Sequence, residues 1–105
     1  MGVTINDLKT FYEIFNLNHG ETTVFLKFGA DWCIPCTELD KILVTIPNSV
    51  IYYISIDNVN FESYLIENHI YTIPHTIIKY GEKTKKAIGI TTTNQIEKYI
   101  EELKK

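Results

Sequence analysis

Two short apolar runs, separated by an amphipathic segment, most constrain how this chain folds. The first, at 22–28, is rich in β-branched and aromatic residues, and the second, at 50–56, reads VIYYISI. Such runs are typical of strands in the middle of a sheet that is covered on both faces. Between them, the segment 33–46 repeats apolar residues at helical spacing. The pattern therefore predicts a strand–helix–strand unit.

The flanking segments extend this unit in both directions. Residues 2–5 are a short extended candidate, and residues 7–15, with Asn6 as a possible N-cap, have helical periodicity. After the second run we expect a short helix at 61–68, a hairpin of 76–80 and 85–90, and a final helix that begins within 91–94. The order βαβαβαββα predicts the α/β class, with a central sheet and helices on both faces.

Size and composition fit one globular unit. The chain has 105 residues, of which 45% are hydrophobic, so we expect a single domain over 1–105 that folds without a structural metal. Its net charge is −3 and its ten basic residues are all lysine, which argues against a nucleic-acid partner.

No apolar run approaches the roughly 18 residues that a membrane span needs. The N-terminal residues 1–7 lack the basic and apolar regions of a signal peptide. We therefore expect a cytoplasmic protein with no membrane partner.

The strongest chemical signal is Trp32-Cys33-Ile34-Pro35-Cys36, which lies between the first apolar run and the helix. A pair of cysteines three apart in a βαβ context is typical of a redox motif. Cys33 would lie at the helix N-terminus, where unpaired N–H groups favour its thiolate, and Cys36 would lie one turn further in. The spacing also permits a disulfide. We therefore interpret one cysteine as a nucleophile and the other as its resolver.

The cysteines have two other interpretations. A zinc site could join them to His69 and His75, but the gap from Cys36 to His69 is far outside the usual spacing of zinc ligands. Alternatively, both could be buried structural cysteines, although Pro35 between them favours a helix start. We expect no bound metal.

Over nearly its whole length the sequence resembles the thioredoxin family. The resemblance lies in the segment VFLKFGADWCIPC at 24–36, in Ile73-Pro74, in Gly81 and in Gly89. It implies a thioredoxin fold, a mixed sheet flanked by helices on both faces. It also implies that Cys33 attacks, that Cys36 resolves, and that Pro74 is a cis-proline packed against the disulfide.

The resemblance further implies substrates and partners. Disulfide-containing protein substrates would dock at Trp32, Ile34 and Pro35 and along the backbone of Ile73 and Pro74. Electrons would come from an NADPH-dependent thioredoxin reductase, and the protein would be a monomer with no cofactor besides its redox-active disulfide.

Three residues depart from the family pattern. Ile34 stands where glycine is usual, which predicts an altered substrate preference and reduction potential. Lys27 occupies a strand position where thioredoxins commonly keep a buried acid. It either extends its ammonium to the surface or lies partly desolvated near the cysteines. In the second case it stabilises a thiolate or, as a neutral amine, accepts the Cys36 proton. His75, where threonine is common, is either a hydrogen-bonded surface residue or a group that tunes the thiolate.

The function predicted from these residues is that of an enzyme, a thiol-disulfide oxidoreductase that reduces protein disulfides through Cys33 and Cys36. The alternative is a protein-binding module of the same fold with slow or vestigial redox activity. Lys27, which departs from the family pattern, is the residue that supports this alternative. An oxidase or isomerase of an oxidising compartment is a third interpretation, which the absence of a recognisable signal peptide disfavours.

Overall fold

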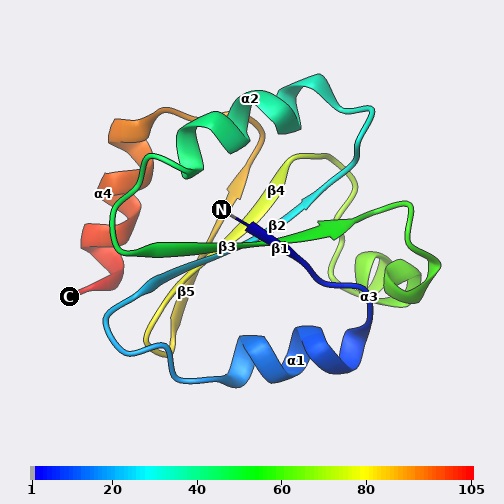
Figure 1. Cartoon of the computed structure of the whole chain (residues 1–105), viewed down its shortest axis with the longest axis horizontal. Coiled ribbons are helices and arrows are strands. Elements are labelled where there is room, and N and C mark those ends of the chain that lie inside the picture. The colour runs from blue at the N-terminus through cyan, green and yellow to red at the C-terminus, as the bar shows by residue number, and fades with distance from the viewer. Residues whose placement is uncertain (1) are drawn as a thin grey trace.

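The structure, a computed structural model, describes residues 2–105 as a mixed five-stranded sheet between two layers of helices (Figure 1). The strand order is β1-β3-β2-β4-β5. The element order and the α/β class predicted from the sequence are confirmed. The elements are β1 (Gly2–Thr4), α1 (Leu8–Asn16), β2 (Thr23–Gly29), α2 (Ile34–Leu43), β3 (Ser49–Ser55), a 3-10 turn (Val59–Phe61), α3 (Glu62–Glu67), β4 (His75–Tyr80), β5 (Lys83–Ile88) and α4 (Thr93–Leu103).

Strand β2 lies at the centre of the sheet and contributes to both hydrophobic layers. Side chains alternate across a strand, and β2 is buried along its whole length. Leu26 and Phe28 pack in the cluster that contains Phe11 of α1. Phe25 packs in the other cluster, with residues of α2 and α4. Figure 1 shows the two layers, with α2 and α4 on one face of the sheet and α1 and α3 on the other.

The pairing of β2 with its two neighbours positions the site. It runs parallel to β3, which also pairs in parallel with β1. It runs antiparallel to β4, and β4 runs antiparallel to β5. The turn between β4 and β5 contains Gly81 at φ 62°, a backbone conformation that glycine adopts without a steric penalty. The short β1 and the lysine-bearing β5 form the two edges of the sheet.

Two helix starts differ from the sequence prediction. The N-cap of α1 is Asp7 rather than Asn6, because the Asp7 carboxylate accepts a 2.8 Å hydrogen bond from the Thr10 N–H. The segment predicted as one helix over 61–68 begins as a 3-10 turn that Asn58 caps, and only then continues as α3.

Among residues 2–105, no helix combines the length and the apolar character that crossing a membrane requires.

The cap of α4 lends itself to a stability test. The Thr92 hydroxyl accepts a hydrogen bond of 3.1 Å from the Gln95 N–H, which satisfies one of the free donors of the first turn. Thr92→Ala should therefore lower the free energy of unfolding by about 1 kcal/mol, whereas Thr92→Ser should keep most of it. Urea denaturation followed by circular dichroism measures both, and equal stability of the two variants would show that the cap contributes nothing.

Candidate active site

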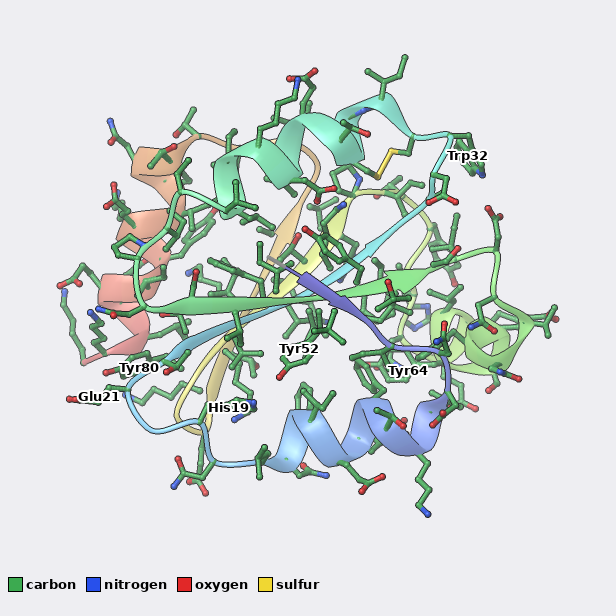
Figure 2. All side chains as sticks on the ribbon, viewed as in Figure 1. His19, Glu21, Trp32, Tyr52, Tyr64 and Tyr80 are labelled. Carbon is green, nitrogen blue, oxygen red and sulfur yellow. A yellow bond between two sulfur atoms is a disulfide. The ribbon has the colours of Figure 1, made fainter. Side chains whose placement is uncertain are left out.

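The two cysteines lie where β2 passes into α2. Cys33 is the N-cap of α2, with Pro35 in the first helical positions and Cys36 in the first turn. Their Cα atoms are 5.3 Å apart, and the sulfur atoms form a disulfide, visible as the yellow bond in Figure 2. The strand–loop–helix placement predicted for this motif is confirmed. The first turn of a helix leaves N–H groups without backbone partners, so it favours a thiolate at this position once the disulfide is reduced.

The rim of the disulfide is apolar and exposed. Cys33 is 6% exposed and Cys36 is 2% exposed, so the sulfur pair lies just below the surface. Trp32 and Ile34, on either side of Cys33, are 66% and 75% exposed. Exposed large apolar side chains beside a reactive group are typical of a surface that contacts another molecule.

The Trp32 side chain is held in place by Asp57. Its indole N–H donates a 2.8 Å hydrogen bond to Asp57 Oδ2. Asp57 follows β3, which is parallel to β2, so the ends of both strands meet at the same edge of the sheet. Sequence reasoning missed this role of Asp57. The sequence feature that could have identified it is its position directly after a strand adjacent to the cysteine loop.

Strand pairing places Pro74 opposite Gly29, the residue at the end of β2. The Ile73-Pro74 peptide bond is cis, as the resemblance implied, and Pro74 is buried. Phe28 pairs with His75 in the β2–β4 ladder, so the residue before His75 continues the register next to Gly29. A Cβ on Gly29 would lie 3.1 Å from Cys36 Sγ. The register thus places Pro74 opposite Gly29, and Ile73, half-buried, lies next to it in the chain.

Lys27 does not reach the surface. It is 4% exposed, and its Nζ lies 2.5 Å from Asp40 Oδ1 of α2, so the interpretation of a lysine extended into solvent is wrong. Along β2, Lys27 alternates with Leu26 and Phe28, so its side chain points to the opposite face of the sheet. That face is the α2 layer, which also contains Phe25. Its Nζ also lies 5.1 Å from the centroid of the Tyr53 ring. Burial of this ammonium is offset by a carboxylate and an aromatic face.

We had not singled out Asp40 from the sequence. Two signals were available: a charge inside an apolar strand requires a partner, and Asp40 lies four residues after Cys36, on the same face of the helix. Asp40 is 33% exposed, whereas its partner Lys27 is 4% exposed. Burial and the Asp40 carboxylate raise the pKa of the Tyr53 phenol, which therefore stays neutral near pH 7.

His75 is buried rather than on the surface. It is 3% exposed, and its ring meets that of Phe28 edge to face, with centroids 6.2 Å apart. The Nε2 atom has no hydrogen-bond partner among the described residues. Burial, followed by the charge of Lys86, lowers the pKa of His75, so its imidazole is neutral near pH 7. The interpretation of His75 as a hydrogen-bonded surface residue is therefore wrong.

A zinc site is not supported. Within 2–105, no group of three or more histidine, cysteine, aspartate or glutamate side chains is arranged to hold a metal ion. His69 Nδ1 instead lies at hydrogen-bond distance, 2.9 Å, from the Tyr71 hydroxyl.

Comparisons with known proteins agree with this geometry. The family model described as Thioredoxin matches residues 3–102. Thioredoxin O1 from Arabidopsis thaliana, in its oxidised state, is 20% identical with a TM-score of 0.76, over 98% of this chain and 97% of that one. Chloroplastic thioredoxin z is 18% identical with a TM-score of 0.79, over 99% and 96%. Thioredoxin from Trypanosoma brucei brucei is 19% identical with a TM-score of 0.77, over 100% and 93%. A search of curated proteins found no match.

The lowered pKa of His75 predicts how stability depends on pH. The folded-state pKa lies below the ordinary value of 6.5, so between the two values the unfolded chain binds more protons. The stabilisation is complete above pH 6.5 and is lost as the pH falls toward the folded-state pKa. The Tm should therefore drop between pH 7 and pH 5, and His75→Asn should reduce that drop.

Thermal unfolding of both proteins across this pH range measures the difference between their slopes. Histidines 19 and 69 are common to both, so their contributions cancel. Parallel pH profiles would show that His75 is not the group responsible.

Proposed function

This chain belongs to the thioredoxin family, and we propose that Cys33 is its attacking thiol and Cys36 its resolving thiol. The chain is a thiol-disulfide oxidoreductase with a redox-active cysteine pair. The observation that carries the assignment of roles is the placement of Cys33 as the N-cap of α2, with Cys36 deeper in the first turn. The helix N-terminus favours the thiolate at Cys33, and the greater exposure of Cys33 makes it the sulfur that a protein substrate reaches.

The reaction has two exchanges. The Cys33 thiolate attacks one sulfur of a substrate disulfide, which forms a mixed disulfide and releases the other substrate sulfur as a thiolate. Cys36 then attacks Cys33 Sγ, releases the second substrate sulfur and forms the Cys33–Cys36 disulfide. The substrate gains two electrons, and the cysteine pair loses two.

The substrate binds as a short extended segment across the rim. Trp32, Ile34 and Pro35 supply exposed contact area beside Cys33, and Asp57 fixes the indole of Trp32. Ile73 and Pro74 lie directly before β4, where backbone groups can pair with an extended peptide. His75, buried and neutral behind Pro74, adds no charge to the reduced cysteine pair near pH 7.

Continued turnover requires a source of electrons. An NADPH-dependent thioredoxin reductase reduces the Cys33–Cys36 disulfide, and a reducing compartment such as the cytoplasm suits this cycle. The chain acts as one domain and as a monomer, with no cofactor besides its disulfide.

A reduction assay tests the proposed roles. With dithiothreitol as electron donor, the wild-type chain should accelerate insulin reduction, and Cys33→Ser should lose at least about a hundredfold of that acceleration, because the nucleophile is gone. Cys36→Ser should instead accumulate mixed disulfides with proteins, because the resolving step is blocked. Mixed disulfides on Cys33→Ser rather than on Cys36→Ser would reverse the roles. No acceleration by wild type would favour a binding module.

The exposed Ile34 side chain predicts an effect on substrate binding. Ile34→Ala removes apolar contact area beside Cys33, so kcat/KM for insulin should fall roughly tenfold, mainly through KM. Val44→Ala is the matched control, because Val44 is also exposed but lies at the opposite end of α2. Equal kcat/KM values for the two variants would show that Ile34 does not contact the substrate.

A further inference from the structure

A pocket opens beneath the disulfide on the α2 face of the sheet. It has a volume of about 340 Å³ and is bordered by β2, by the cysteine loop, by α2 and by β3. The sulfur-bearing residue on its wall is Cys36, the inner cysteine of the pair. The ionisable residues on its wall are Lys27, Asp31, Asp40 and Tyr53. The pocket therefore joins the resolving cysteine to a group of charged and polar side chains.

Lys27 and Cys36 approach the same point in this region. An added Cβ on Gly29 would lie 3.1 Å from Cys36 Sγ and 3.4 Å from Lys27 Cε. The side chain of Lys27 thus borders the same space as the inner sulfur, and its Nζ lies 2.5 Å from Asp40 Oδ1. The absence of a side chain on Gly29 leaves this space free.

Asp40 is the member of the ion pair that can accept a proton. It lies four residues after Cys36 in α2, so both side chains project from the same helical face and border the pocket. A carboxylate has free acceptor lone pairs, whereas an ammonium has none. Because Asp40 is 33% exposed, it can pass a proton on to solvent.

We propose that Asp40, held in place by Lys27, is the base that takes the proton from Cys36 across this pocket when Cys36 resolves the mixed disulfide. The proposal rests on the roles of Cys33 and Cys36 given above and names the group that serves the second exchange. Lys27 is a positioning residue: it anchors the carboxylate, and its positive charge stabilises the thiolate that forms beside it.

Every proton and electron pair in this step has a donor and an acceptor. The Cys36 S–H bond breaks, and its proton goes to the Asp40 carboxylate. The electron pair left on Cys36 Sγ forms the bond to Cys33 Sγ, while the bond between Cys33 and the substrate sulfur breaks. The departing substrate sulfur leaves with that pair and takes a proton from water, and Asp40 returns its own proton to solvent.

A two-phase reaction separates the two cysteines. One equivalent of dithiobis-nitrobenzoate, an aromatic disulfide, is mixed with the fully reduced chain in a stopped-flow instrument. The first release of coloured thiolate reports attack by Cys33, and the second reports resolution by Cys36. Asp40→Asn should slow the second phase at pH 7 by at least about tenfold and leave the first within about twofold of wild type, since general base catalysis contributes only to the step it serves.

The pH profile distinguishes a base from a structural role. With Asp40 present, the second phase should depend only weakly on pH near neutrality. In Asp40→Asn, hydroxide or water must take the proton, so the second phase should accelerate steeply with pH. Asp40→Glu, which keeps a carboxylate, should restore a weak dependence. A second phase that is slow but keeps the wild-type pH profile would overturn the proposal.

Three further variants complete the test. Glu38→Gln is the matched control, because Glu38 lies on α2, is exposed and does not border the pocket. It should behave as wild type. Asp31→Asn removes the charge of the other carboxylate on the pocket wall and should leave the rate of the second phase unchanged. A slower second phase in Asp31→Asn, with a normal one in Asp40→Asn, would overturn the proposal. Lys27→Met should slow the second phase because it removes the anchor, and a wild-type rate would overturn the part assigned to Lys27.

Failure of the proposed cysteine roles gives a different result. If Cys33 is not the nucleophile, Cys33→Ser keeps the first phase of thiolate release. If Cys33 is the nucleophile and the first phase is normal, an unchanged second phase in Asp40→Asn contradicts the proton acceptor alone. Near-ultraviolet circular dichroism of each variant shows whether it has folded before its kinetics are compared.

Discussion

The structure depends on the two-residue alternation of side chains along the central strand β2. Leu26 and Phe28 enter one hydrophobic layer, while Phe25 and Lys27 face the other. A shift of one residue in the pairing of β2 would move every apolar side chain to the opposite face, so burial on both faces fixes the register. The same register determines which residues meet the cysteine pair, since β2 leads directly into the loop that carries it.

The charge on this strand is the main chemical difference from the family pattern. Thioredoxins commonly carry an acid where this chain has Lys27, and here the acid comes from the adjacent helix as Asp40. A buried lysine without a partner would strongly destabilise the fold, so the ion pair satisfies the lysine and at the same time brings a carboxylate to the pocket below Cys36. One pair of residues thus meets a requirement of stability and a requirement of the proposed chemistry.

The order of the elements, the α/β class and the placement of both cysteines were predictable, because they follow from patterns local in sequence. Apolar periodicity identified each strand and helix, and Pro35 with Cys33 marked the start of α2. The partners of Lys27, His75 and Trp32 were not predicted. Each of these depends on which segments the sheet brings together: α2 over β2, β4 beside β2, and the end of β3 beside the cysteine loop. The position of a lysine or a histidine in the sequence does not indicate which segments will surround it. Either residue is as compatible with an exposed site as with a buried site that has a partner.

The edges of the sheet have a consequence for association between copies of the chain. An edge strand offers unpaired N–H and C=O groups to any other strand, and it is a common starting point for aggregation. Here β1 has only three residues, and β5 carries Lys83, Lys85 and Lys86, of which Lys83 and Lys86 are exposed. Two β5 edges brought together would align like charges across the new ladder, which opposes their pairing. The sheet is thus poorly suited to templating its own growth, and a concentrated solution of the folded chain is protected from polymerising through its strands.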